Sequence, residues 1–361
     1  MGIEDKIQSV EEKLEKTPIN KATEKERARL KSRIAELKEQ KQKKAKGTGD
    51  TSGYAVEKHG DVTAALVGFP SVGKSTLLNE ITNADSDTGA YEFTTLDVNP
   101  GMMDHKGAKI QVLDVPGLIG GAADGRGGGK QVLSVVRNAE IVLIVLDPEE
   151  MREDEIKQEV DNAGIRINTD LPNMKIEKKD RGGIKISKTV DGGLEEDTIR
   201  DLMRQHGYAN ADVVIREEMD IDRFIDGLMD NRKYIPAITA VNKIDTVEAE
   251  RRKEFEEKYD LVFSAETGEN LDKLKDLMFD RLELIRVYMK EKGEDADKDE
   301  PLILRKGATV EEAMNELPGE MKRRFKDARV SGPSSKFPNQ RVGMEHELMD
   351  EDVLELNLKH L

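Results

Sequence analysis

The chain has 361 residues and a formal net charge of −16 at pH 7, and its charged fraction of 37% slightly exceeds its hydrophobic fraction of 36%. This length predicts two or three domains, and the charge predicts much solvated surface and argues against a protein that coats nucleic acid. The absence of cysteine excludes disulfides, thiol catalysis and cysteine-ligated zinc. Without a long apolar run or a signal-peptide segment, we expect a cytoplasmic protein that does not contact a membrane.

Residues 1–46 are expected to form a helical hairpin of the helix-turn-helix kind, because apolar side chains recur at helical spacing on both sides of a break at Pro18. The segment holds 14 lysines and arginines against 9 acidic residues. Its basic excess fits either a solvated helix face or an arm that contacts RNA phosphates, and the sequence leaves both open. Residues 47–60 have the composition of a linker.

Residues 61–290 alternate between apolar strands, loops and helices, a pattern that predicts an α/β domain with a mostly parallel sheet. The strand segments are nearly continuous apolar runs, which suit strands buried on both faces. We expect strands at 62–67, 109–114, 140–147 and 235–241. We expect helices at 75–81, 130–138 and 271–288.

Almost ninety residues separate the last two of these strands, far more than one crossover helix requires. Short strand and helix signals within them predict an inserted α+β subdomain at about 164–230. An acidic linker is expected at 291–300. The remaining residues, 301–361, predict a compact β-rich module that contains a capping box at Thr309 and Glu312.

Residues 68–75 have the spacing of a P-loop, and they lie between a predicted strand and a predicted helix, as that motif requires. Its glycines allow the backbone N–H groups and the helix N-terminus to surround phosphates. Lys74 is expected to add positive charge at the β- and γ-phosphates, and the Ser75 hydroxyl to ligate Mg²⁺. The phosphate site is thus expected to comprise Gly68, Pro70, Ser71, Val72, Gly73, Lys74, Ser75 and Thr76.

The run Asp114-Val-Pro-Gly117 ends the next strand. A carboxylate at Asp114 can hold the Mg²⁺ shell through water, and the Gly117 N–H can meet the γ-phosphate and sense its loss. Between the P-loop and this run, Thr94 or Thr95 can reach Mg²⁺ and the γ-phosphate, and we favour Thr95. The expected catalytic residues are therefore Lys74, Thr95 and Gly117, and the expected Mg²⁺ residues are Ser75, Thr95 and Asp114.

The run Asn242-Lys243-Ile244-Asp245 follows another apolar strand. The Asp245 carboxylate can accept two hydrogen bonds from guanine, at N1–H and the N2 amine, whereas adenine offers neither donor. Each buried partner left unpaired costs roughly 1–3 kcal/mol, so the motif selects the base. After a short strand at 261–263, the Ala265 N–H is expected to donate to guanine O6. The base site is expected to comprise Asn242, Lys243, Asp245, Ser264, Ala265 and Glu266.

These motifs occur in a fixed order, and each follows a strand, at the edge where open α/β sheets bind ligands. They predict a protein that binds GTP and GDP. A P-loop ATPase or a small-molecule kinase is the alternative that the base motif opposes.

Three runs, at 68–76, 91–96 and 114–122, resemble the developmentally regulated GTP-binding protein (DRG) family of Obg-like GTPases, and the glycine run at 125–129 fits as well. In the last module the resemblance rests on 307–313, 339–343 and 348–353. It covers nearly the whole chain. It implies that residues 1–46 are the family's helix-turn-helix segment, that 164–230 are its inserted domain, and that 301–361 are its TGS domain, a ubiquitin-like β-grasp.

The same resemblance implies hydrolysis of GTP to GDP and phosphate with Mg²⁺, and a ribosome-associated switch in translation. It also implies contact with the ribosome or its RNA and with a helper protein that stabilises or stimulates the GTPase. We expect the chain to act as a monomer. The alternative is a nucleotide-gated scaffold or a ribosome-assembly factor in which hydrolysis is incidental.

Two positions depart from better-understood GTPases. Leu118 stands where many GTPases have a glutamine that orients the attacking water, so we expect slow intrinsic turnover. In related enzymes without that glutamine, K⁺ supplies charge near the phosphates with a P-loop asparagine as ligand. Here Ser71 occupies that position and offers one hydroxyl. Arg126 is a candidate charge donor, although a solvated loop arginine is the simpler interpretation.

Overall fold

The computed structural model describes residues 2–46, 58–82, 98–115, 129–229, 232–290, 294–317 and 319–358. Its contacts divide the chain into two compact units. The first comprises Met1–Gly53 and Thr169–Tyr234, and the second comprises Tyr54–Asn168 and Ile235–Leu361. The chain therefore enters the second unit, returns to the first and enters the second again.

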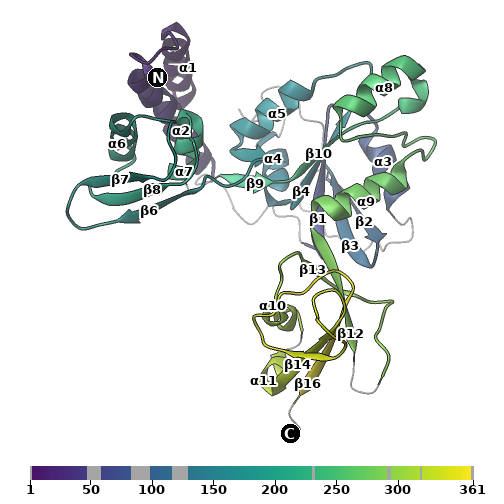
Figure 1. Cartoon of the computed structure of the whole chain (residues 1–361). Coiled ribbons are helices and arrows are strands. Elements are labelled where there is room, and N and C mark those ends of the chain that lie inside the picture. Colours follow the sequence, from purple (N-terminus) through teal and green to yellow (C-terminus); the bar gives the residue numbers. More distant parts are fainter. Residues whose placement is uncertain are drawn as a thin grey trace. The chain divides into compact units, whose positions relative to one another are not determined.

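The first unit combines the N-terminal hairpin with the inserted segment (Figure 1). Helices α1 (Ile3–Lys16) and α2 (Glu24–Lys46) pack on each other, and α2 also packs on α6 (Glu196–Gln205) and α7 (Ile221–Leu228). The three-stranded sheet has the order β6-β8-β7, with β6 antiparallel and β7 parallel to the central strand. Its strands are β6 (Met174–Lys178), β7 (Ile184–Lys188) and β8 (Ala211–Ile215). Ala28 and Ala35 of α2 belong to the same apolar cluster as Phe224 and Leu202 of the inserted segment.

Ion pairs join basic residues of α2, and Lys21 in the preceding turn, to acidic residues of the inserted segment. Asp201 of α6 accepts Lys25 at 3.1 Å and Arg29 at 2.8 Å. Lys31 pairs with Asp222, and Lys21 pairs with Glu195 at 2.9 Å. The basic residues between 21 and 31 thus face acidic partners within the chain, while the side chains of Lys21, Lys25 and Arg29 remain 83%, 44% and 55% exposed.

The second unit contains a six-stranded sheet with the order β11-β10-β4-β1-β3-β2. All neighbouring strands are parallel except β2, which is antiparallel to β3 at the edge. Strands β1, β4 and β10 are buried along their whole length, because helices cover both faces of the sheet. The strands are β1 (Val62–Val67), β2 (Asn99–His105), β3 (Ala108–Asp114), β4 (Ile141–Leu146), β10 (Ala237–Val241) and β11 (Leu261–Val262).

In the described part of this unit, five α-helices (Figure 1) and one short 3₁₀ helix accompany the sheet. They are α3 (Lys74–Ile81), α4 (Gly129–Asn138), α5 (Glu153–Asn162), α8 (Ala249–Lys258), α9 (Leu271–Arg281) and the 3₁₀ helix η4 (Ile244–Thr246). A separate two-stranded sheet is formed by β5 (Ile165–Ile167) and β9 (Lys233–Ile235). Within the described part of the chain, no helix is long and apolar enough to span a bilayer.

A five-stranded sheet with the order β13-β12-β16-β14-β15 completes the second unit. Thr309 accepts the Glu312 N–H and Glu312 accepts the Thr309 N–H, which is the expected capping box at the start of α10. Val287, Met314, Val330 and Leu354 lie in the apolar core of this part. Its elements are β12 (Leu284–Lys290), β13 (Leu302–Arg305), α10 (Val310–Asn315), α11 (Gly319–Arg324), β14 (Phe325–Ser331), β15 (Gln340–Val342) and β16 (Asp352–Leu358).

The prediction of one helix over 271–288 is wrong beyond Arg281, where α9 ends. Glu283 adopts a left-handed backbone with φ 51°, and the next residues form β12, which pairs with β13 and β16. The apolar residues Leu284, Ile285 and Val287 fit a helix stripe and a strand equally well, and the pairing partners are distant in the sequence. The C-terminal sheet therefore begins at Leu284 and not at residue 301.

Candidate functional site

The P-loop connects β1 to α3 and requires glycine at position 73, the N-cap of α3. Gly73 has φ 93°, and a Cβ atom there would lie 2.3 Å from Nδ2 of Asn242. A side chain at this position is therefore excluded both by the left-handed backbone and by a buried neighbour. Within the loop Val72 is buried, whereas Pro70, Ser71 and Thr76 are exposed.

The Lys74 ammonium lies inside the loop, where the side chain is only 7% exposed. Its Nζ donates to the carbonyl oxygens of Gly68 and Phe69, each at 3.0 Å. Burial lowers the pKa of Lys74, while the nearby charge of Asp114 acts in the opposite direction. A buried cation with only carbonyl partners is well suited to receive an anionic phosphate.

Ser75 and Asp114 meet directly, since the Ser75 hydroxyl donates to Oδ2 of Asp114 at 2.6 Å. The parallel pairing of β1 with β3 places Asp114 opposite Leu66, just before the P-loop. Mg²⁺ takes one or two protein oxygen ligands and completes its shell with water and substrate phosphates, so this pair fits the ion. Among the described residues no group of three or more His, Asp or Glu side chains gathers into another metal site.

Asn242 joins three of the predicted motifs and is only 2% exposed. Its Nδ2 donates to the carbonyl of Val72 in the P-loop at 2.9 Å. Its Oδ1 accepts the N–H of Ala265 at 2.9 Å. The Ala265 N–H thus donates to protein here, and its expected bond to guanine O6 requires this bond to be shared or exchanged.

Lys243 also reaches the P-loop. It has a left-handed backbone with φ 57°, and its Nζ donates to the carbonyl of Ser71 at 2.9 Å and to Oδ2 of Asp147 at 2.7 Å. Burial acts to raise the pKa of Asp147, but hydrogen bonds from Lys243 and from the Glu149 N–H outweigh it and lower that pKa below its ordinary value. Asp147 therefore remains a carboxylate at neutral pH.

Sequence reasoning did not single out Asp147, although a signal was present. The residue directly follows β4, just as Asn242 follows β10. A polar residue at the C-terminal end of a buried parallel strand lies at the ligand-binding edge of the sheet. That position alone was sufficient to make Asp147 a candidate.

The remaining base-site residues lie in two short turns. Asp245 is exposed within η4, and its carboxylate bonds no other residue that the structure describes. Ser264 is buried and accepts the Thr267 N–H at 3.2 Å, while Glu266 is exposed. The Asp245 carboxylate is thus accessible to a ligand. The predicted residues Thr95, Gly117, Leu118 and Arg126 lie outside the described residues.

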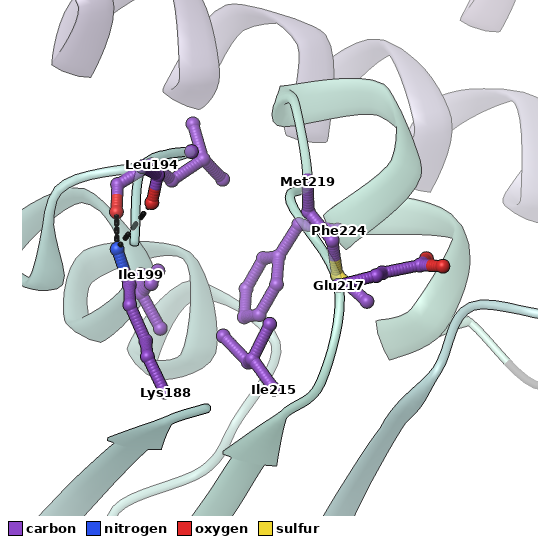
Figure 2. A pocket seen from close by; sticks show the side chains of 9 residues that line it. Lys188, Leu194, Ile199, Ile215, Glu217, Met219 and Phe224 are labelled. Atoms are coloured by element: carbon purple, nitrogen blue, oxygen red, sulfur yellow. Dashed lines mark hydrogen bonds between the residues drawn. The ribbon is translucent and has the colours of Figure 1, made fainter. Parts of the chain in front are cut away.

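A small cavity in the first unit is a separate feature with a structural role (Figure 2). Its volume is about 10 Å³, which holds one water at most. The Lys188 ammonium donates there to the carbonyl oxygens of Gly192 and Leu194, and Phe224 packs beside Ile215. This lysine therefore ties down a loop and does not form a ligand site.

The P-loop, the Ser75–Asp114 pair and the base motif at one edge of a mostly parallel sheet define the class of P-loop GTP-binding proteins. Family models agree along the chain. Residues 63–179 match the 50S ribosome-binding GTPase model, residues 181–284 match the C-terminal region of the same domain family, and residues 285–357 match the TGS domain.

Relatives extend this match to the full length. An uncharacterised GTP-binding protein of Halobacterium salinarum is 47% identical over 98% of both chains. Developmentally-regulated G-protein 3 of Arabidopsis thaliana is 41% identical over 98% of both, and developmentally-regulated GTP-binding protein 2 of Bos taurus is 38% identical over 99% of both. The chain belongs to the developmentally regulated GTP-binding protein family, as its motifs predicted.

Among solved structures, a GTP-binding protein from Pyrococcus horikoshii aligns with a TM-score of 0.42 and 16% identity. The alignment covers 82% of this chain and 99% of that chain. At this TM-score and identity, the alignment does not define the fold or the function of this chain. The GTPase and TGS assignments rest on the family models and on the sheets described above.

Proposed function

We propose that this chain binds GTP with Mg²⁺ and hydrolyses it to GDP and phosphate. The observation that carries the proposal is the pair of hydrogen bonds made by the buried Asn242 side chain, which join the phosphate loop to the base-binding turn. Membership of a GTPase family supports the same reaction. The contact between the Ser75 hydroxyl and Asp114 Oδ2 at 2.6 Å supports the assignment of these two residues to Mg²⁺.

The residues divide the work according to their chemistry. Ser75 and Asp114 would hold Mg²⁺, which neutralises charge on the phosphate oxygens when it is bound. Lys74 can exchange its two carbonyl partners for phosphate oxygens, because it gains a charge-assisted bond in place of neutral ones. Asp245 would select guanine. We further assign Thr95 to the Mg²⁺ shell and the γ-phosphate, and the Gly117 N–H to sensing that phosphate.

Turnover without a partner should be slow. An apolar residue at position 118 cannot orient the attacking water, so another group must position it. The matching family model is described as a ribosome-binding GTPase, and on that basis we propose that the large ribosomal subunit stimulates hydrolysis. The second candidate function is a nucleotide-gated scaffold or a ribosome-assembly factor, in which hydrolysis is incidental. Leu118 favours this candidate, because its apolar side chain cannot orient the attacking water.

Single-turnover hydrolysis of γ-labelled GTP separates these functions. We expect hydrolysis to require Mg²⁺, to stop in Lys74→Ala and to accelerate with purified ribosomes, while the exposed surface variant Lys185→Ala behaves as wild type. A parallel reaction with K⁺ tests whether that ion supplies charge at the site. Nucleotide-dependent binding to ribosomes without faster hydrolysis would support the scaffold function. If bound GTP is never hydrolysed under these conditions, the proposal that the chain is a GTPase is refuted.

A further inference from the structure

The turn that follows β4, residues 147–152, contacts both the base motif and the P-loop. Oδ1 of Asp147 accepts the Glu149 N–H at 2.9 Å, and the backbone carbonyl of Asp147 accepts the Glu150 N–H at 3.1 Å. These two bonds close a tight turn whose first residue is an aspartate, the residue that such turns favour. Oδ2 of the same carboxylate remains for Lys243. The carboxylate is thus fixed at one oxygen and offers the other to the base motif.

Two arginines outside the base motif also contact this turn or lie within it. The Arg152 guanidinium lies 3.7 Å from the centre of the Phe69 ring, in the P-loop, and pairs with Glu150 and Glu155. Arg251 of α8 donates to the carbonyl of Pro148, which belongs to the same turn. Residues 147–152 therefore contact the P-loop and α8, in addition to Lys243.

Two neighbouring P-loop carbonyls are held by the base motif. Lys243 binds the carbonyl of Ser71, and Asn242 binds the carbonyl of Val72. A trans peptide is planar, with its C=O and N–H pointing in opposite directions. Fixing these carbonyls on the side of the base motif therefore turns the N–H groups of Val72 and Gly73 away from it, which makes them available to an anion in the loop.

Ser71 needs this restraint more than its neighbours do. Its φ of 66° is left-handed, which is strained for a residue other than glycine. Lys243 can supply the restraint only while its own ammonium is held, because its side chain is 40% exposed and its four-carbon stem is flexible. The Asp147 side chain is 15% exposed, so it is the more fixed partner of the pair.

We propose that Asp147 is a positioning residue for guanine nucleotide binding, which acts by holding Lys243 against the Ser71 carbonyl so that the P-loop N–H groups face the phosphates. Asp147 does not need to touch the nucleotide. A purely structural ion pair would instead stabilise only the local fold. Its loss would lower the melting temperature without a specific loss of nucleotide affinity.

The first measurement compares nucleotide affinities of Asp147→Asn with those of the wild type. We expect the dissociation constants for GTP and GDP to rise together by about tenfold, the loss for one partly exposed charge-assisted hydrogen bond. The affinity for GMP should change less, because the P-loop N–H groups surround the α- and β-phosphates and GMP carries only the first of these. Fluorescent analogues of the three nucleotides report all three constants.

Asp260→Asn is the matched control. Asp260 also accepts one backbone N–H, from Thr239 at 2.8 Å, and one cation, Arg281 at 2.9 Å, but it precedes β11 at the opposite edge of the sheet. It should lower the melting temperature about as much as Asp147→Asn and leave the nucleotide constants unchanged. Equal losses of nucleotide affinity in the two variants would overturn the proposal.

A double-mutant cycle tests the route through Lys243. If Asp147 acts through that lysine, then Lys243→Met with Asp147→Asn binds nucleotide no more weakly than Lys243→Met alone. Additive losses, or unchanged affinity in Asp147→Asn, would overturn the proposal. Should Asp147→Asn fail to fold, Asp147→Glu keeps the charge and displaces it by one methylene, and it should show the same pattern of GTP, GDP and GMP constants with smaller changes.

Discussion

Replacing Gly73 with alanine tests the geometry of the P-loop most sharply. The residue has φ 93°, and its new Cβ would lie 2.3 Å from Asn242 Nδ2, well inside contact distance. The amide that must move is the one that binds the Val72 carbonyl. Gly73→Ala therefore disturbs the backbone and the link to the base motif in a single substitution.

The expected loss follows from these two effects. A left-handed backbone costs a residue other than glycine about 1–2 kcal/mol. Loss of the Asn242–Val72 hydrogen bond costs roughly 1 kcal/mol more. The free loop of the variant can relax, and GTP binding must then restore the native loop geometry. The sum of about 2–3 kcal/mol therefore corresponds to a rise of roughly 30- to 160-fold in the dissociation constant for GTP.

Equilibrium titration with a fluorescent GTP analogue measures this rise. Gly307→Ala is the control, because Gly307 has φ 84° but no described atom within 4 Å of an added Cβ. It should lower stability through backbone strain alone and leave GTP affinity unchanged. In an Asn242→Ala background, the further loss caused by Gly73→Ala should shrink to the backbone cost. Wild-type GTP affinity in Gly73→Ala would refute the reasoning.

Two further predictions concern stability. Burial lowers the pKa of His206, which bonds the Ser32 hydroxyl at 2.9 Å, so its contribution to folding is complete above the unfolded pKa near 6.5 and is lost as pH falls below it. Hydrogen-exchange protection factors in α2 and α6, which are corrected for the pH dependence of intrinsic exchange, should therefore fall between pH 7.5 and 5.5 in the wild type and fall less in His206→Gln. Thr309→Ala removes the capping box of α10 and should cost about 1 kcal/mol in chemical denaturation, whereas Thr309→Ser should restore it; equal stability of all three would contradict the capping role.

Local sequence patterns were sufficient to predict much of the site. The strand predicted at 62–67 has the same bounds as β1, because a run of six apolar or β-branched residues is typical of a strand buried on both faces. The glycine spacing of the P-loop predicted the turn into α3, and the structure places Lys74 inside that loop. In each case the signal lies within about ten neighbouring residues.

Features that depend on distant pairs could not be predicted in this way. Strand β12 exists because Val287 pairs with Asp352 and with Leu302, and nothing between 284 and 290 specifies those partners. The ion pairs that join α2 to the inserted segment depend on Asp201 and Asp222, which are more than 150 positions away. The Asn242 side chain was expected to serve the base site, but its contact with Val72 depends on how β10 and the P-loop meet.

The central claim is that Asp245 selects guanine at this site, and one substitution tests it directly. Asp245→Asn exchanges a double acceptor for an amide, which should weaken GTP binding by about a hundredfold and favour the xanthine nucleotide, whose C2 oxygen accepts a hydrogen bond. Asp272→Asn, at an exposed carboxylate on α9, controls for the loss of one negative charge. The account predicts that titrations with GTP and XTP reverse their order in Asp245→Asn alone, and an unchanged preference for GTP in that variant would contradict it.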